Sequence, residues 1–538
     1  MAFLRVENKK SGKYLRIVES YRDESGISRH RILYTLGKLE DYTPEELKRI
    51  GSKLYELGGG DLKDLLEITT GEKARFNYGY FQVFSKALSH YKLPRLFGQI
   101  GSKHKLGFDL QNAVLLMILE RLQDPCSKRS SYFNQNEYLG IEKVELQHLY
   151  RSLDKLADYN KAIQKQIYQT GRDLFNQQLD VVFYDVTTLY FESELEQEGA
   201  LRQKGFSKDG KIGTTQILFC LLIDRDKQPI GYQVFKGDTF EGHTFEKAVK
   251  DLKKDYQINQ VIVVADRGML SKNNLDVTTE SGYEFIVGER LKKLPGSLQD
   301  FLLDLKNYHG EWSYSDSEDQ LVMVRYATIE YQGRVIIGTY SAKRAKKDAH
   351  DRAEKLQTAE TLLSRPELLS KKAGRFYLKK QGSQTYQLDQ EKIKRDERFD
   401  GFLAIATNNK SLSVSETLEQ YKHLYKIEHT FRTFKSHLET RPMFHWTDKR
   451  IEGHICLCYL SYTLLNFTLL KLEKAGFKTT EGKLRKLLDK MQVSLVEQQD
   501  KNYFLRSAAS EEETDFQQKL GLKSLPSVLN VASLNQYL

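Results

Sequence analysis

The sequence predicts an α/β protein built around a mixed sheet, and two observations support that fold class. From residue 179 to about 290, apolar residues recur with a period of two, which is typical of strands. Three successive strands are followed by helix, strand, helix and strand, an order that gives a mixed sheet with flanking helices. The strands are expected at 181–191, 212–223, 229–236, 260–265 and 284–288, and the helices near 243–256 and 271–281.

Two smaller regions are predicted before this sheet. Strand-like runs at 14–21 and 28–36 precede Thr43-Pro44, a pair that opens a helix with proline at its first position. Residues 1–75 are therefore expected to form a hairpin followed by a helix. From 76 to 178 the apolar spacing becomes helical, so this stretch is expected to be all-α.

The remainder of the chain predicts an insertion and then the rest of the core. Strand-like runs and four Lys or Arg residues within 343–347 make the insertion β-rich and locally basic. The run 402–408 is expected to be the last core strand, and Ser413 caps a long helix expected to reach about Leu438. The predicted division is 179–295 for the first part of the core, 296–400 for the insertion, 401–475 for the second part with the long helix, and 476–538 for a helical tail.

The composition suggests a polyanionic partner without identifying it. The formal net charge of the 538 residues is +10, but 83 Lys and Arg stand against 73 Asp and Glu, so an ordinary basic protein fits equally well. Four cysteines without CxxC spacing fit a reducing cytoplasm. No signal peptide is expected at the N-terminus. The longest apolar stretch, 455–470, is interrupted by polar residues and predicts a buried helix, so no membrane is implied.

Three acidic residues on rigid elements are the candidates for catalysis. Asp185 ends the apolar run 181–184, Asp266 follows the run 261–265, and Glu428 lies on the predicted long helix. A carboxylate in an apolar strand is costly unless it is paired or bound to a metal. Three such groups can hold two divalent ions for in-line attack on a phosphodiester. In the alternative interpretation, Asp185 accepts backbone hydrogen bonds and Asp266 caps the helix that begins near Ser271.

One face of the predicted long helix presents acidic and basic side chains together. At about 100° per residue, Tyr421, Glu428 and Lys435 fall within roughly 20° of one another, and Arg432 lies about 40° away. A solvated helix shows the same spacing. The two strand-end aspartates strengthen the functional interpretation of this face, because Glu428 could form an acidic trio with them.

Several motifs resemble those of bacterial insertion-sequence DDE transposases, and the likeness extends over most of the chain. The most similar branch is the IS-four type, whose last acidic residue lies in a Tyr-x2-Arg-x3-Glu-x6-Lys pattern and whose catalytic core has a β-strand insertion. This sequence departs from the pattern at Leu424, which stands at the arginine position. The motifs are Tyr184-Asp185-Val186-Thr187-Thr188, Val264-Ala265-Asp266-Arg267-Gly268 and the segments 205–210, 427–436, 121–129 and 441–446.

The resemblance implies a ribonuclease-H-like core in which Asp185, Asp266 and Glu428 bind two Mg²⁺ or Mn²⁺ ions. The implied reaction is hydrolytic nicking at the ends of a mobile element, followed by attack of the freed 3′-hydroxyl on target DNA. Members of this branch resolve the second strand through a DNA hairpin, with an aromatic side chain stacked on a flipped base. Trp312 is the candidate for that stacking, and a core position is the alternative for this tryptophan.

The resemblance also implies double-stranded DNA as the partner, both as terminal inverted repeats and as target. Tyr421 and Lys435 match the flanking pattern and would contact DNA, and Arg432 would supply the cation missing at Leu424. A homodimer is expected, because two element ends must be handled at once. The protein is expected to act in the bacterial nucleoid. Further phosphate contacts are expected from Arg267 and, in the all-α region, from Lys128 and Arg129.

Two other functions fit the same residues. A metal-dependent nuclease or resolvase would keep the acidic trio and stop at hydrolysis. A sequence-specific DNA-binding protein, such as an inactive transposase relic acting as a repressor, would use residues 1–178 without chemistry. The intact trio argues against the second of these, because a relic has no reason to keep all three acids.

Overall fold

The computed structural model divides the chain into two compact units. One comprises Met1–Lys73 with Val496–Tyr503, and the other comprises Ala74–Leu495 with Phe504–Leu538. The predicted positions 206–210, 212 and 260 lie outside the residues that the structure describes. The described residues are 2–24, 26–59, 72–175, 181–196, 200–205, 213–256, 258, 261–269, 271–315, 319–365, 375–381, 385–498 and 501–537.

The N-terminal unit contains a three-stranded antiparallel sheet rather than a hairpin alone. Strands β2 (Gly12–Arg22) and β3 (Ser28–Lys38) form the expected hairpin, and β1 (Ala2–Lys9), which the sequence analysis missed, pairs with β2. Helix α1 (Pro44–Leu57) begins with a capping box, in which the backbone N–H of Glu46 donates to Thr43 and the backbone N–H of Thr43 donates to the Glu46 carboxylate.

The predicted mixed sheet is confirmed in the larger unit. Its first five strands lie in the order β8–β7–β5–β9–β10, with a short strand β6 (Gln203–Lys204) added beside β7. The pairs β5/β7 and β7/β8 are antiparallel, whereas β5/β9 and β9/β10 are parallel. The bounds are β5 Val181–Tyr190, β7 Thr215–Ile223, β8 Pro229–Lys236, β9 Ile262–Ala265 and β10 Glu284–Glu289.

Three strands of the predicted insertion continue this sheet, and two others form a separate two-stranded ribbon. Strand β16 (Phe402–Thr407) pairs antiparallel with β10 on one side and with β13 (Arg334–Tyr340) on the other. Beyond β13 follow β12 (Leu321–Tyr331) and β11 (Gly310–Ser315). The insertion also contains α10 (Gly296–Leu303), α11 (Ala342–Ser364), α12 (Gln390–Glu397) and the ribbon of β14 (Leu378–Gln381) and β15 (Thr385–Leu388).

The long helix expected from Ser413 to about Leu438 is wrong, because the backbone breaks it into three segments. The N–H of Leu424 donates to Tyr421 O and the N–H of Lys426 donates to His423 O, so the chain tightens to three-residue turns there. It then widens to a π-helical turn at Thr433–His437. The regular helices that remain are α13 (Val414–Lys422) and α14 (Tyr425–Arg432).

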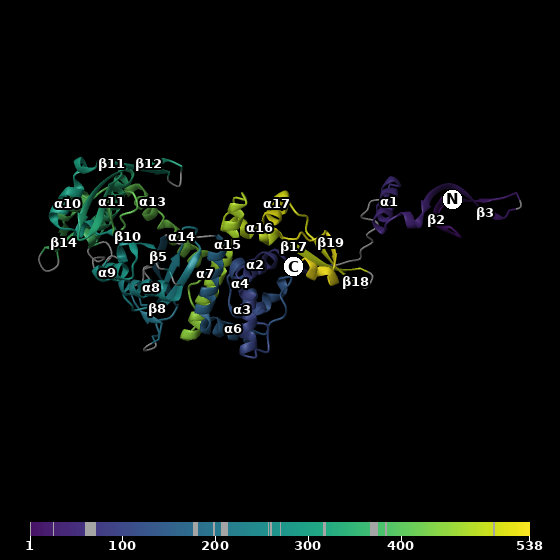
Figure 1. Cartoon of the computed structure of the whole chain (residues 1–538), viewed down its shortest axis with the longest axis horizontal. Helices are drawn as coiled ribbons and strands as arrows, with labels where there is room; N and C mark the ends of the chain where they lie inside the picture. The colour runs from purple at the N-terminus through teal and green to yellow at the C-terminus, as the bar shows by residue number, and fades with distance from the viewer. Residues whose placement is uncertain are drawn as a thin grey trace. The chain divides into compact units, whose positions relative to one another are not determined.

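Helices cover both faces of the sheet. On one face, α8 (Glu241–Tyr256) and α9 (Lys272–Glu280) bury apolar side chains against β5, β9 and β10. The other face packs against α14 and α15 (Asp448–Lys474). Figure 1 shows α15 beside the helices predicted as an all-α region. These helices are α2 Gly79–His90, α3 Leu93–Lys103, α4 Leu110–Gln123, α5 Lys128–Asn134, α6 Leu146–Asp158 and α7 Asn160–Phe175.

Helix α15 is the central helix of this unit. By length and composition it could cross a membrane, yet 83% of its most apolar window is buried inside the protein, as expected for the run 455–470. Its contact with α6 is close enough to require glycine: a Cβ on Gly453 would lie 2.1 Å from the backbone oxygen of Leu153. The backbones of the two helices therefore touch at this point.

The C-terminal tail is not only helical, in contrast to the prediction. Between α16 (Glu481–Lys490) and α17 (Glu511–Leu520) the chain forms strands β17 and β18, and β19 follows α17. The three strands join β4 in a four-stranded sheet. Their bounds are β4 Glu72–Asn77, β17 Gln492–Gln498, β18 Lys501–Arg506 and β19 Val528–Asn530.

The approach of α15 to α6 predicts a stability change. Gly453→Ala is expected to lower the free energy of unfolding by about 1–3 kcal/mol or more, because backbone atoms of α6 cannot move aside as a side chain would. The matched control is Gly98→Ala on α3, where a Cβ meets nothing within 4 Å, so alanine should raise stability by up to about 1 kcal/mol. Equal thermal unfolding midpoints for Gly453→Ala and the native chain would contradict this packing.

Candidate active site

The register of two central strands brings Asp185 and Asp266 together. Tyr184 of β5 pairs with Ala265 of β9 in parallel, so the residues that follow them occupy neighbouring positions on strands that lie roughly 4.8 Å apart. Side chains alternate along a strand, which places both aspartates on the same side as Phe183 and Val264. That side of the sheet packs against α14.

Each of the two carboxylates accepts a hydrogen bond from the backbone N–H of the residue that follows it. One oxygen of Asp185 accepts the N–H of Val186 at 2.7 Å, and one oxygen of Asp266 accepts the N–H of Arg267 at 2.7 Å. Helix α9 is capped instead by Ser271, whose hydroxyl accepts the N–H of Asn274 at 3.2 Å. The alternative in which Asp266 caps this helix is therefore wrong.

Glu428 reaches the same site from α14. Its neighbour Ile427 and Phe431, one turn further on, are buried in the core cluster that also contains Phe183. Phe431 packs against Phe219 of β7, with ring centroids 6.0 Å apart. Because these apolar side chains fix the helix on the sheet, Glu428 is left exposed at its edge.

A cavity of about 520 Å³ is lined by all three carboxylates. Among the described residues, no group of three or more His, Cys, Asp or Glu side chains lies close enough together to hold a metal ion. Asp185, Asp266 and Glu428 therefore share one cavity without closing around a single point. Oxygen donors of this kind are the ligands that Mg²⁺ and Mn²⁺ prefer.

Tyr421 lies against the acidic residues in this cavity. Burial raises its pKa, and the negative charges of Asp266 and Glu428 act in the same direction, so the hydroxyl stays protonated. A Cβ on Gly288 of β10 would lie 2.5 Å from this hydroxyl oxygen and 3.0 Å from the backbone nitrogen of Arg267. The absence of a side chain at Gly288 therefore leaves room for the Tyr421 hydroxyl.

The rest of the cavity is cationic and aromatic. Lys422 lies with its ammonium 4.0 Å from the centroid of the Tyr314 ring, and Trp312 lies 5.1 Å from the same ring. Trp312 is partly buried against the main core and also lines this cavity, so the core position and the stacking role both stay open for it. The basic stretch at 343–347 is predicted from the sequence without a role. The cations that line the cavity are Lys343, Arg344 and Lys347 from α11 and Lys422 from α13.

The structure brings Leu424 into this cavity but not several of the predicted DNA contacts. Arg432 is exposed and Lys435 lies half-buried in the π-helical turn, and neither lines the cavity. The predicted common face of Tyr421, Glu428 and Lys435 requires one straight helix. The break at 423–424 and the π turn therefore make this prediction wrong. Arg267 is exposed in the turn after Asp266 and lines a neighbouring cavity of about 630 Å³.

Lys128 and Arg129, predicted as phosphate contacts, face different surroundings on α5. Ser127 caps this helix, its hydroxyl accepting the N–H of Ser130. Arg129 is exposed and lies 6.0 Å from the centroid of the Phe133 ring. Lys128 is only 4% exposed and lines a separate cavity, so it is not part of a solvated surface loop.

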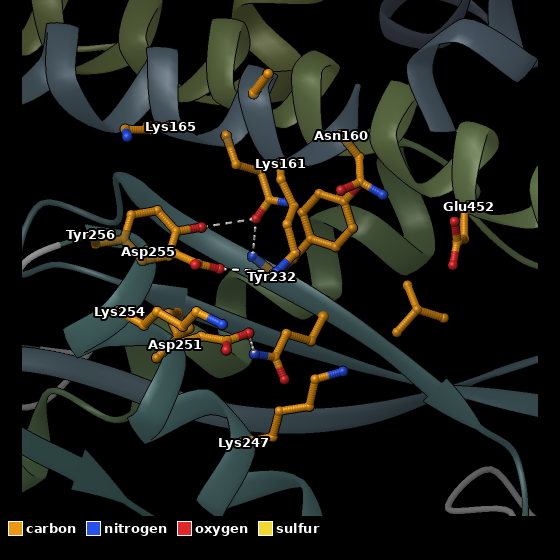
Figure 2. A pocket seen from close by; sticks show the side chains of 15 residues that line it. Asn160, Lys161, Lys165, Tyr232, Lys247, Asp251, Lys254, Asp255, Tyr256 and Glu452 are labelled. Carbon is orange, nitrogen blue, oxygen red and sulfur yellow. Dashed lines mark hydrogen bonds and ion pairs between the residues drawn. The ribbon is translucent and has the colours of Figure 1, made fainter. Parts of the chain in front are cut away.

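Another cavity, of about 350 Å³, lies between α7, β8 and α8 (Figure 2). Lys161 pairs with Asp255 at 3.0 Å, and the amide of Gln233 donates to Asp251 at 2.6 Å. The Tyr256 hydroxyl donates to Gln164 at 3.1 Å. The buried side-chain oxygens of Gln233 and Tyr232, which also line this cavity, have no hydrogen-bond partner among the described residues, and we assign no site there.

Two family matches cover much of the chain. The IS1634 family transposase N-terminal domain matches residues 4–59, and the transposase DDE domain matches residues 176–464. No curated protein shows significant similarity.

Solved structures give weaker similarities. A cryo-EM piggyBac transposase synaptic complex with hairpin DNA is 8% identical, covering 77% of this chain and 78% of that chain with a TM-score of 0.38. A Mos1 transposase paired-end complex with the left transposon end is 13% identical, covering 32% and 57% with a TM-score of 0.15. The DDE domain match, by contrast, spans more than half of the sequence. The chain therefore belongs to the insertion-sequence DDE transposases, metal-dependent enzymes that cut DNA and transfer its strands.

Proposed function

We propose that the cavity lined by Asp185, Asp266 and Glu428 is the active site of a cut-and-paste transposition reaction at terminal inverted repeats. The observation that carries the proposal is the meeting of three carboxylates from three separate segments in one cavity that cationic and aromatic side chains also line. The acidic groups suit divalent ions, and the cations suit the phosphates of a DNA strand.

A ribonuclease-H-like core is the fold we assign to the first five strands. Their order is β8–β7–β5–β9–β10, with antiparallel pairing among the first three and parallel pairing from β5 to β10. In this arrangement β5 is the middle strand and carries Asp185. The IS-four pattern remains a prediction, with Leu424 as its departure.

The acidic trio fits two Mg²⁺ or Mn²⁺ ions by the chemistry of its donors. When bound, such ions stabilise the attacking and the leaving oxygen of the phosphodiester. The adjacent strands β5 and β9 hold Asp185 and Asp266 side by side, and α14 carries Glu428 from the opposite wall. The sheet thus fixes two of the ligands, and only Glu428 depends on the docking of a helix.

The other cavity residues position the DNA in this proposal. Tyr421, neutral because its pKa is raised, donates a hydrogen bond to a phosphate oxygen rather than adding negative charge. Arg344 and Lys422 line the cavity that Leu424 also lines, so they are better placed than Arg432 to replace the missing arginine. Trp312 offers a ring for a flipped base at the rim.

The remaining parts of the proposal concern partners and assembly. The element ends and the target would both be double-stranded DNA, bound by a homodimer in the bacterial nucleoid. Lys435 and Arg432, outside the cavity, would contact the duplex further from the cleaved bond, together with the exposed Arg129 and Arg267. The net charge of +10 favours such phosphate contacts in general.

Removal of any acid of the trio is expected to abolish chemistry and spare DNA binding. Asp185→Ala, Asp266→Ala and Glu428→Ala should each lower cleavage and strand transfer by on the order of 10³-fold or more, because several kcal/mol of charge stabilisation are lost. The assay uses DNA carrying the flanking inverted repeats, with Asp276→Ala, an exposed acid on α9, as control. Cleavage without joining by the native chain would favour a nuclease. Binding without either reaction would favour a repressor.

Divalent ions should stabilise the native chain measurably. At a concentration 100 times the dissociation constant, a bound ion raises the free energy of unfolding by about 2.7 kcal/mol, which thermal unfolding with Mg²⁺ or Mn²⁺ detects. The double variant Asp185→Ala/Glu428→Ala should lose this increase, while Asp276→Ala keeps it. An equal increase in all three proteins would place the ions elsewhere. Cleavage should also cease in EDTA and return with either ion.

Gly288→Ala tests whether the position of Tyr421 matters. The added Cβ would lie 2.5 Å from the Tyr421 hydroxyl, so the ring must move, and displacements of about 1 Å can cost up to roughly 100-fold in rate. Tyr421→Phe removes the hydroxyl that the Cβ meets. The two substitutions should therefore be non-additive, with the double variant no slower than the slower single variant. Additive losses in strand-transfer rate would show that Gly288 acts through another contact.

A further inference from the structure

A second large cavity lies outside the acidic site and shares no lining residue with it. Its volume is about 680 Å³, within the usual range for small-molecule sites. Helices α4, α5, α6 and the start of α15 enclose it together with the segment 439–447. The residues that matter for its chemistry are Arg121, Lys128, Phe444, His445, Trp446 and His454.

Two buried cations in this cavity have no acidic partner. Lys128 is 4% exposed, and within the described part of the chain its ammonium has neither a hydrogen bond nor an ion pair. Arg121 is 6% exposed and donates only to backbone carbonyls, at 3.0 Å to Leu438, while its buried Nε has no partner. Buried charge without compensation is strongly destabilising, so an anion is the missing partner.

Two of the nearby acids are engaged elsewhere, and the third, Glu439, lines the cavity as an exposed residue. Asp154 pairs with Arg450 at 2.5 Å, and Glu120 accepts from the thiol of Cys126 at 2.6 Å. The Nδ1 atom of His454 is buried without a partner, and the His445 ring lies 5.0 Å from that of His454. Burial and the charge of Arg121 lower the pKa of Lys128 to about 7, and a bound anion would favour its charged form.

The cavity also has aromatic side chains that remain accessible. Trp446 is 55% exposed and Phe444 is 74% exposed, unusual values for such large apolar side chains. The Arg202 guanidinium lies 4.3 Å from the Trp446 ring centroid. Aromatic rings beside phosphate-binding cations are the combination that binds single-stranded nucleic acid, because every base has a stacking face.

We propose that this cavity is a nucleotide-binding site, with a phosphate held by Arg121 and Lys128 and the base stacked on Trp446 or Phe444. The phosphate offers acceptors to the ammonium of Lys128 and to the unpartnered Nε of Arg121, and the exposed parts of the Trp446 and Phe444 rings offer a base a surface to stack on. The ligand is either a nucleotide of a DNA strand or a free nucleotide, which present the same chemistry. Nothing in the site requires a metal, so it can be tested separately from the acidic trio.

Intrinsic fluorescence gives a direct test, because the chain has only two tryptophans. In a full-length Trp312→Phe background, all tryptophan emission comes from Trp446. In EDTA, we expect saturable quenching by a short single-stranded oligonucleotide or by deoxyadenosine monophosphate. Quenching by the oligonucleotide alone would identify a DNA strand as the ligand. Quenching by the monophosphate, relieved by inorganic phosphate, would identify a free nucleotide.

An exposed arginine on the neighbouring helix α6 provides the comparison, because Arg151 does not line the cavity. Lys128→Met should weaken binding by at least about tenfold, since a charged hydrogen bond is lost, whereas Arg151→Met should leave it unchanged. If Lys128→Met fails to fold, Trp446→Leu in the native background provides the second variant. It should weaken nucleotide binding measured by equilibrium dialysis and leave inorganic phosphate binding intact.

Two results would overturn the proposal. One is unchanged Trp446 emission at millimolar nucleotide and at oligonucleotide concentrations that saturate a mobility shift. The other is equal affinity of folded Lys128→Met and Arg151→Met. Since the titration is done without metal, either result would contradict nucleotide binding at this cavity without changing the conclusion of the transposition assays on the acidic trio.

Discussion

The parallel pairing of β5 with β9 is the constraint on which the acidic site depends. Pairing of Tyr184 with Ala265 puts Asp185 and Asp266 at neighbouring positions, and a slip of one residue would turn one of them to the opposite face. The register is held because β5 is apolar on both faces and buried between two helical layers. Glu428 then joins through α14, whose apolar residues pack on the same face.

The insertion completes the site because it is part of the same sheet. Strand β16 links β10 to β13, so β11 is held by continuous strand pairing, and α11 begins directly after β13. Trp312 and the cations of α11 therefore have a fixed relation to the aspartates. A cavity that is lined by both acids and cations follows from that continuity.

Strand positions and the meeting of Asp185, Asp266 and Glu428 in one cavity could be predicted from the sequence, and the details that required tertiary packing could not. Period-two patterns locate β5 and β9, since buried strands need apolar residues on both faces. The break at 423–424 leaves no such mark, because Leu424 and His423 suit a helix and only packing against the sheet selects the break. Lys128 is predicted as a phosphate contact, which requires an accessible side chain, because a lysine is rarely buried, and nothing local in the sequence shows its burial.

The acidic cavity and the cavity of Arg121 and Lys128 differ in how they could hold a strand of DNA. In the acidic cavity the three carboxylates repel a phosphate beside them until divalent ions neutralise them, although four cations line the same cavity, so chemistry there depends on metal. The cavity of Arg121 and Lys128 has cations without partners and attracts phosphates in the absence of metal. A protein with both can bind a strand at one cavity before the ions enter the other. Binding and chemistry would then depend on different conditions, although one folded unit contains both cavities.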